Sequence, residues 1–264
     1  MKWLLRARVI PWLHARYPVA VQQARVVRTA GIPESRMAEK MEGLEGELDP
    51  RIAIAYLPSY DGTKLELKLQ GEPGETAALA AILDDAQQKI VRLFAQYVYS
   101  LEDKAPDQLL AEWLLRHNRS FATAESCTGG EIAAKLVKHS GISAVFKGGV
   151  VAYMAEVKEA LLGVNAATIR EKGIVSAEVA AEMAEGVRIA LGTDYAVAIT
   201  GIAAAAKEAP AEGQPQAWLG FAGPGGTATQ HIRLMKDRRV NIEIAAYAAL
   251  VFALRQVSAE AAKH

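Results

Sequence analysis

The sequence predicts two domains, a small α+β unit followed by an α/β domain, and three observations support this. The length of 264 residues is enough for two hydrophobic cores. Residues 51–99 combine two strand patterns with one long helical pattern, whereas helix and strand patterns alternate over residues 108–257. A charged, proline-containing segment at 100–107 lies between them and is the predicted linker. We therefore expect domains at 1–104 and 105–264.

The first domain begins with an apolar, arginine-rich segment that we interpret as a surface helix ending near Tyr17. Arginines and Pro11 interrupt its apolar run, so it does not read as a signal peptide. Leucines alternate with charged residues over 64–70, which together with 51–56 predicts a half-buried hairpin. A stripe of leucine and isoleucine then predicts a helix over 76–99.

The second domain shows the alternation that is typical of an open α/β sheet. Its last helical pattern is alanine-rich and apolar, and we expect it to pack on the sheet or against a second subunit. In chain order the sequence predicts helices over 108–117, 131–139, 156–162, 177–190 and 240–257, strands over 120–124, 145–153 and 194–200, and a hairpin around 223–226.

Composition restricts the class of protein. Lys plus Arg equals Asp plus Glu at 30 each, which gives no indication of nucleic acid as a main partner. No apolar run approaches the roughly 18 to 20 residues of a membrane span, so we expect no membrane association. Residues 1–33 hold six basic residues and no acid, a pattern more typical of a solvated face than of a binding arm. The single cysteine excludes an internal disulfide framework and a thiolate metal site, and it fits a reducing cytoplasm.

The most informative segment is Thr123–Gly130, where a strand turns into a helix. Free backbone N–H groups are expected to point outward at such a turn. An ordinary N-cap by Ser126 or Thr128 would explain part of the pattern, but the concentration of small and polar residues favours a functional site. Cys127 is a second candidate nucleophile, although a lone cysteine of this kind is more often packed and inert.

Two further strand ends carry polar groups, because Tyr153 follows one predicted strand and Thr200 with Gly201 follows another. Lys158 lies in the helix after Tyr153, and a lysine with a lowered pKa can activate a serine in place of histidine. A solvated lysine and a packed tyrosine are the plainer alternatives. The sequence predicts no histidine triad, and it favours a hairpin turn over a phosphate loop at residues 223–226. The five histidines are at positions 14, 117, 139, 231 and 264.

Five motifs together resemble the C-terminal domain of the competence-damage inducible protein family, CinA, from Gln108 to the end of the chain. They read AESCTGG (124–130), GGVVAYMAEVK (148–158), LLGV (161–164), VSAEV (175–179) and AITGIA (198–203). Residues 20–100 resemble the KH-like middle domain of the same family, through AGIPESRMAE (30–39) and AYLPSYDG (55–62). The resemblance implies a three-layer α/β/α domain after a small KH-like α+β domain. It also implies that the molybdopterin-binding-like N-terminal domain of longer members is lacking here.

The resemblance implies nicotinamide mononucleotide deamidase activity, in which a carboxamide is hydrolysed and ammonia is released. Ser126 would be the nucleophile and Lys158 its base, while Tyr153 and Thr128 would help in positioning or proton transfer. Backbone N–H groups from Thr128 to Gly130, at the start of the following helix, would hold the oxyanion or the phosphate. No metal or cofactor is implied, and members form homo-oligomers, here expected as a dimer. The implied substrate-binding residues are Gly129, Gly130, Thr200, Gly201 and Arg238.

The sequence departs from the family pattern around this site. Met154 and Ala155 stand where the family has Ser-Asn, residues 201–207 lack the family's glycines, Gln214–Ala217 lacks its lysine, and Ile242 replaces an arginine. The open alternatives are an amidohydrolase of altered or weak activity and a non-catalytic nucleotide-binding or assembly protein. RNA binding ranks lower, because no Gly-x-x-Gly loop stands at the corresponding turn of the KH-like region.

Overall fold

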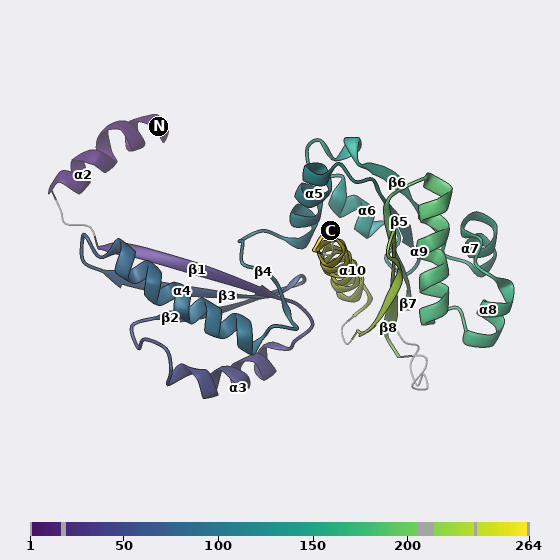
Figure 1. The fold of residues 1–264 in the computed structure, drawn as a ribbon, viewed down its shortest axis with the longest axis horizontal. Helices are drawn as coiled ribbons and strands as arrows, with labels where there is room; N and C mark the ends of the chain where they lie inside the picture. The colour runs from purple at the N-terminus through teal and green to yellow at the C-terminus, as the bar shows by residue number, and fades with distance from the viewer. Residues whose placement is uncertain (1, 17–19, 205–213, 235–236, 263–264) are drawn as a thin grey trace. The chain divides into compact units, whose positions relative to one another are not determined.

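The computed structural model describes residues 2–16, 20–204, 214–234 and 237–262. The chain divides into two compact units, Met1–Asp103 and Lys104–His264. Each unit has its own sheet (Figure 1). Buried apolar residues form one hydrophobic cluster in unit 1 and two in unit 2. The fold is therefore a small α+β unit followed by an α/β unit, as the sequence predicts.

Unit 1 contains a four-stranded antiparallel sheet in the order β2-β3-β1-β4, with α4 packed against β1 and β3 (Figure 1). Leucines at alternate positions of β3 point into the core that α4 closes. Before the sheet, helical residues 2–16 form α1 (Lys2–Leu4), the π-helical η1 (Leu5–Val9) and α2 (Ile10–Arg16). The other elements are β1 (Val21–Thr29), α3 (Glu34–Glu45), β2 (Ala53–Ser59), β3 (Gly62–Gly71), α4 (Thr76–Leu93) and β4 (Val98–Ser100).

Two features of unit 1 differ from the sequence-based expectations. The helix predicted over 76–99 ends at Leu93, because Val98–Ser100 pairs with β1 as a short strand. Strand β1 and helix α3 were not predicted from the sequence. The arginines and glutamines of β1 obscure its alternation of apolar and polar residues. Its central place in the sheet comes from pairing with β3 on one side and β4 on the other.

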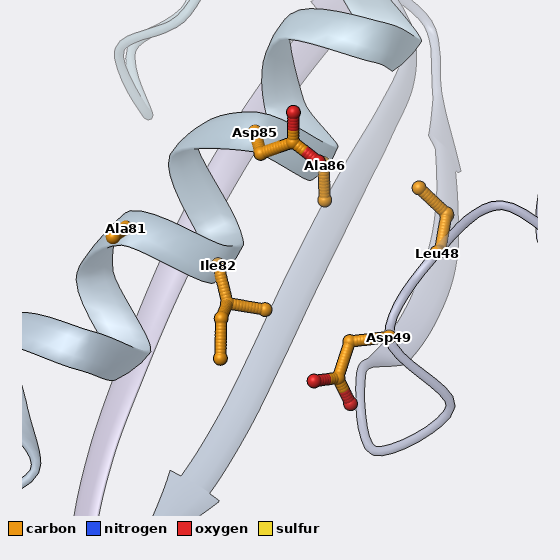
Figure 2. A pocket seen from close by; sticks show the side chains of 6 residues that line it. All are labelled: Leu48, Asp49, Ala81, Ile82, Asp85 and Ala86. Atoms are coloured by element: carbon orange, nitrogen blue, oxygen red, sulfur yellow. The ribbon is translucent and has the colours of Figure 1, made fainter.

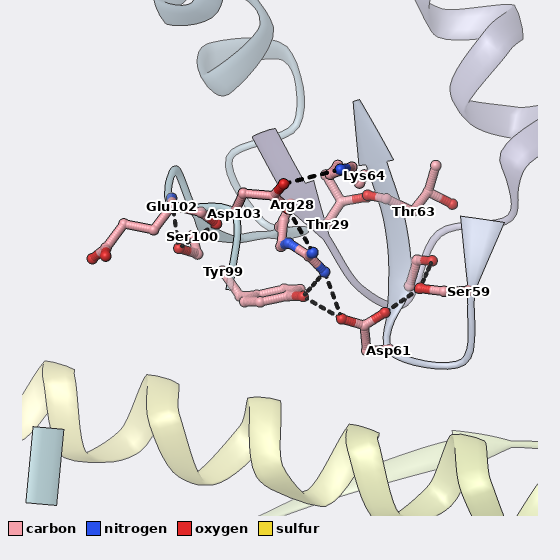
Figure 3. A network of polar contacts seen from close by, with 11 residues as sticks. Arg28, Thr29, Ser59, Asp61, Thr63, Lys64, Tyr99, Ser100, Glu102 and Asp103 are labelled. Carbon is pink, nitrogen blue, oxygen red and sulfur yellow. Dashed lines mark hydrogen bonds and ion pairs between the residues drawn. The ribbon is translucent and has the colours of Figure 1, made fainter. Parts of the chain in front are cut away.

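A cluster of charged and polar residues joins the β2–β3 turn to the segment after β4 (Figure 3). Arg28 of β1 donates to Asp61 at 2.8 Å and to Asp103 at 2.7 Å. Tyr99 also donates to Asp61, at 2.9 Å, and Ser59 bonds the other oxygen of that carboxylate. Arg28, Asp61 and Asp103 each face an opposite charge, which is typical of a structural network.

Unit 2 contains a five-stranded sheet in the order β6-β5-β7-β8-β9, in which β5 runs parallel to β6 and β7 while β8 and β9 are antiparallel. The strands are β5 (Phe121–Glu125), β6 (Phe146–Val151), β7 (Tyr195–Ile202), β8 (Gln216–Gly223) and β9 (Gly226–Arg233). The turn between β8 and β9 is the predicted hairpin. Strand β6 ends at Val151, two residues before its predicted end.

Helices cover both faces of this sheet, so the unit has the predicted three layers (Figure 1). Helix α9 packs on one face, and α10 with α5 and α6 lies on the other. The helices are α5 (Pro106–His117), α6 (Glu131–Leu136), the 3-10 helix η2 (Ile142–Ala144), α7 (Ala155–Leu162), α8 (Ala166–Lys172), α9 (Ala177–Leu191) and α10 (Arg238–Ala261). By length and composition α10 could cross a membrane, but half of its apolar window is buried and it packs on β7 and β8 as a core helix.

The strand register brings the carboxyl ends of β5 and β6 to one level, whereas β7 continues three residues further, to Ile202. Glu125 at the end of β5 lies opposite Val151 of β6 and Ile199 of β7. The residues that follow these positions therefore gather at one edge of the sheet, where ligands bind in open α/β folds.

Candidate active site

The turn after β5 brings Ser126 to this edge. Gly129 and Gly130 have φ of +64° and +106°, in the left-handed region that favours glycine, and α6 begins at Glu131. Gly129 N–H donates to the carbonyl of Ser126 at 3.1 Å, which closes a tight turn. The glycines of the motif are thus required by the turn itself.

Ser126 and Lys158 lie together, as expected for a nucleophile and its base. The two side-chain polar atoms, Lys158 Nζ and Ser126 Oγ, are 3.0 Å apart, and Lys158 is 0% exposed. Lys158 Nζ also donates to the carbonyl of Ala152 and, at 3.4 Å, to that of Tyr153. A neutral amine has two hydrogens and one lone pair. The two carbonyls can accept the hydrogens, and the lone pair then faces the Ser126 hydroxyl.

The protonation of Lys158 fits the role of a base. Burial lowers the pKa of Lys158 to about 8, against an opposing influence of Cys127 that raises it. The described residues place no carboxylate in hydrogen-bonding contact with Nζ. Since the ammonium form lacks an anionic partner, about a tenth of this lysine is neutral at pH 7, far more than for an ordinary lysine.

Glu125 is a residue of this site that the sequence analysis quoted in a motif but gave no role. It is 1% exposed, and its carboxylate accepts hydrogen bonds from Thr128 Oγ1 (2.7 Å) and from the N–H groups of Gly130 (3.0 Å), Ile132 (3.0 Å) and Ala133 (2.9 Å). The signal that could have found it is an acidic residue ending an otherwise small and apolar strand, just before a helix N-terminus.

This contact corrects part of the expectation that the N–H groups from Thr128 to Gly130 hold an oxyanion or a phosphate. Gly129 and Gly130 use their N–H groups within the protein, on Ser126 and Glu125. The physical reason is that a buried carboxylate from the strand already satisfies the orphan donors of the helix. Within the described chain the Thr128 N–H has no hydrogen-bond partner, so the donors available to a ligand lie earlier in the turn.

Thr128 and Cys127 are both buried in the turn. The Thr128 hydroxyl faces Glu125, so its geometry is that of a group that positions the turn. Burial raises the pKa of the Cys127 thiol to about 11, which disfavours the thiolate that a cysteine nucleophile requires. Ser126 is therefore the better nucleophile candidate of the two.

Tyr153 and Arg238 form the outer part of the site. Arg238, the first residue of α10, donates from Nη2 to the Tyr153 hydroxyl at 3.0 Å. The Tyr153 side chain is 54% exposed, while its carbonyl is one of the groups around Lys158 Nζ. These two predicted site residues thus lie beside the Ser126–Lys158 pair and remain open to solvent.

Thr200 and Gly201 lie inside β7, which continues to Ile202, and not at its end. The Thr200 hydroxyl donates to the carbonyl of Ile174 at 2.8 Å, before α9. A Cβ at Gly201 would come within 2.6 Å of the Gln216 carbonyl on the neighbouring strand, so this glycine permits close strand pairing. The structure does not bring either residue into contact with the Ser126–Lys158 pair.

The described histidine side chains have other partners. His117 contacts the Trp113 carbonyl, His139 contacts Asp107, and His231 contacts Gln216. Among the residues that the structure describes, no group of three or more His, Cys, Asp or Glu is placed to hold a metal ion.

A groove in unit 1 is a separate feature, lined by Leu48, Asp49 and residues of α4, with a volume of about 360 Å³ (Figure 2). Asp49 pairs with Arg51, and Asp85 of α4 pairs with Lys89. Both carboxylates of the groove are thus already engaged, and the groove offers no unpartnered charged group for a ligand.

The fold and the site together define a protein with a KH-like α+β unit and an α/β unit that carries a buried serine and lysine pair. Residues 103–257 match the CinA C-terminal domain, and residues 24–100 match the damage-inducible protein CinA KH domain. The chain belongs to the CinA family.

Curated relatives and solved structures agree with this assignment. The chain is 36% identical over 98% of its length to a CinA-like protein of Salinibacter ruber, of which it covers 62%, and 38% identical over 77% of its length to one of Parasynechococcus marenigrum, of which it covers 48%. The chain thus spans less than two thirds of these relatives.

Two crystal structures match unit 2. Competence damage-inducible protein A of Klebsiella pneumoniae is 29% identical with a TM-score of 0.54 and covers 59% of this chain and 98% of that one. The competence/damage inducible protein CihA of Agrobacterium tumefaciens is 30% identical with a TM-score of 0.52, and the match covers 59% of this chain and 99% of that one.

Proposed function

We propose that this chain hydrolyses a small carboxamide through an acyl-enzyme, with nicotinamide mononucleotide as the substrate that the family resemblance favours. The observation that carries the proposal is the 3.0 Å contact between Ser126 Oγ and the buried Lys158 Nζ. A serine is a poor nucleophile without an adjacent base, and a lysine with a lowered pKa supplies one. The pKa of Lys158, lowered to about 8 by burial, suits this role.

In the proposed reaction, neutral Lys158 accepts the hydroxyl proton as Ser126 Oγ attacks the carboxamide carbon. The carbonyl oxygen becomes an oxyanion, for which we assign the N–H groups of Cys127 and Thr128 as donors. The C–N bond then breaks, and Lys158 returns the proton to the departing nitrogen so that ammonia leaves. Water attacks the resulting ester by the same route, and the carboxylic acid is released while the serine hydroxyl is restored.

The test is ammonia release from nicotinamide mononucleotide at high protein concentration, with Ser126→Ala and Lys158→Ala as the decisive variants. Lys147→Ala, which removes an exposed lysine of β6, is the matched control. We expect activity in the wild type and the control and its loss in both decisive variants. Release that survives Ser126→Ala would refute the covalent mechanism.

One observation favours a second candidate function, a non-catalytic binding or assembly protein. Residues 203–206 are four alanines, where the resembling family carries a glycine-rich loop. A well-folded wild type that releases no ammonia from nicotinamide mononucleotide or from other small amides would support this second candidate.

A further inference from the structure

We propose that Glu125 is the positioning residue of the Ser126–Lys158 site and that its carboxylate, not a bound substrate anion, occupies the start of α6. The expected change in kcat rests on the proposed function, whereas the contacts of Glu125 rest on the structure alone. Glu125 itself touches neither Oγ of Ser126 nor Nζ of Lys158, so it acts through the groups that it holds.

Glu125 is connected to Ser126 through the turn that follows β5. The turn 126–130 runs from the backbone of Glu125 back to the side chain of the same residue, through Thr128 Oγ1 and Gly130 N–H. Two further bonds from Ile132 and Ala133 attach the carboxylate to the first turn of α6. Ser126 thus lies in a loop that starts at the backbone of Glu125 and is closed at its other end by the buried side chain of the same residue.

Glu125 is also connected to Lys158, through Ala152. The Glu125 carbonyl accepts a hydrogen bond from Ala152 N–H at 2.8 Å, and the Ala152 carbonyl in turn accepts one from Lys158 Nζ. The same residue therefore fixes the nucleophile through its side chain and the anchor of the base through its backbone. A displacement of about 1 Å at such a site can reduce a rate by about 10²-fold.

The charge of Glu125 also affects where an anion can bind. A buried carboxylate at the start of α6 repels a phosphate there and uses the N–H groups that would bind it. An anionic substrate group must therefore bind elsewhere, and Arg238 beside Tyr153 is a described cation at the open side of the site. Glu125 thus disfavours an anion at the start of α6, while Arg238 offers a positive charge on the open side of the site.

The variant for the test is Glu125→Gln, with Glu131→Gln as the matched control. Glu131 is the first residue of α6, and its carboxylate pairs with Lys135. Glutamine cannot accept at both terminal atoms, so Glu125→Gln sets an N–H₂ group against backbone donors. We expect kcat to fall about 10²-fold with KM changed less than about threefold, and the control to retain its kcat.

A substrate-free readout separates this inference from the proposed function. Titration of the Lys158 Nζ by ¹⁵N NMR should show its pKa rising from about 8 toward 10.5 in Glu125→Gln, because a loosened turn admits water. An unchanged pKa overturns the inference, and so does a lower pKa, which would mark a direct charge effect. If the wild type releases no ammonia, the proposed function fails while this titration still decides the role of Glu125.

Thr128→Val and Thr128→Ser cover the case in which Glu125→Gln does not fold. Valine removes one of the donors to the carboxylate, whereas serine keeps the hydroxyl. We expect Thr128→Val to lower kcat about threefold to tenfold and Thr128→Ser to restore it. Equal kcat in wild type and Thr128→Val would overturn the inference.

Discussion

Unit 2 contains two buried lysines, Lys135 and Lys158, and the regions around them supply opposite kinds of hydrogen-bond partner. Lys135 on α6 is 3% exposed and forms ion pairs with Glu131 at 2.9 Å and Glu243 at 2.6 Å, with the Tyr247 ring 4.1 Å away. Burial would lower its pKa, but the hydrogen bonds to Glu243 and Glu131 outweigh burial and raise the pKa. Lys158 has only a hydroxyl and two carbonyls in contact with Nζ, and its pKa falls to about 8.

The difference teaches that the partner, and not burial, decides whether a buried lysine is structural or reactive. Carboxylates hold Lys135 as an ammonium ion that joins α6 to α10. Neutral oxygens leave Lys158 able to give up its proton, which is what a general base requires.

Replacing each lysine with arginine should give the largest difference in activity between the two regions. Lys158→Arg keeps a permanent positive charge that cannot accept the serine proton, so we expect kcat for ammonia release to fall at least about 10³-fold. Lys135→Arg keeps both ion pairs and should retain most of the activity. Similar losses in the two variants, at matched thermal stability, would contradict the assignment of Lys158 as the base.

Giving Lys158 the carboxylate that it lacks should make it resemble Lys135. Cys127 lies close enough to influence the pKa of Lys158, so Cys127→Asp should raise that pKa. We expect the rate at pH 7 to fall about 10- to 100-fold and the pH dependence to move to higher pH. Cys127→Ser is the control and should leave the pH dependence near that of the wild type.

Removing the charge of Lys135 should lower the free energy of unfolding, whereas removing that of Lys158 should raise it. Lys135→Met leaves two carboxylates without their cation, and the free energy of unfolding should fall by about 2 kcal/mol. Lys158→Met removes a buried ammonium that has no anionic partner, and at pH 7 the free energy of unfolding should rise by about 1 kcal/mol.

Urea unfolding at pH 7 measures both changes, and pH dependence gives a second check. The folded-state pKa of Lys158 lies below its usual 10.5, so the unfolded chain binds more protons between pH 8 and 10.5. This lysine should therefore make the wild type more stable as pH rises through that range. Destabilisation of equal size in both methionine variants would remove the distinction between the two lysines.

The pH dependence of the reaction should follow the neutral form of Lys158. With a pKa of about 8, about a tenth of this lysine is neutral at pH 7. We expect kcat/KM to rise nearly tenfold from pH 7 to pH 9 and to level off above pH 8. The measurement is ammonia release between pH 6 and 9.5, and a profile that is flat across pH 7 to 9 would exclude Lys158 as the titrating base.

The smallest effect is expected at the exposed cation of the site. Arg238 pairs with the Tyr153 hydroxyl on the solvent side, where a charged contact is weak. Arg238→Ala should raise KM for nicotinamide mononucleotide about threefold to fivefold and leave kcat nearly unchanged. The same KM increase with nicotinamide riboside, which lacks the phosphate, would argue against Arg238 as an anion-binding residue.

The sequence by itself determined the two-unit organisation, the α/β alternation of the second unit and the candidate pair Ser126 and Lys158. These follow from local patterns, since alternation, helical periodicity and glycine-rich turns are read within a few residues. The hairpin at residues 223–226 is of this kind. Element ends were less well predicted, as at residues 94–100, because strand pairing with a distant segment decided them.

Only the tertiary structure decided which of these residues share an environment. Lys135 meets Glu243 from 108 positions away and Lys158 meets Ser126 from 32 positions away, so the partners that set the protonation of each lysine come from distant parts of the chain. Two other contacts also depend on the tertiary structure. The Thr200 hydroxyl donates to the Ile174 carbonyl, and the Glu125 carboxylate accepts from N–H groups of α6. The protonation of a buried group depends on the charges and dipoles within a few ångströms of it, and folding alone brings these together.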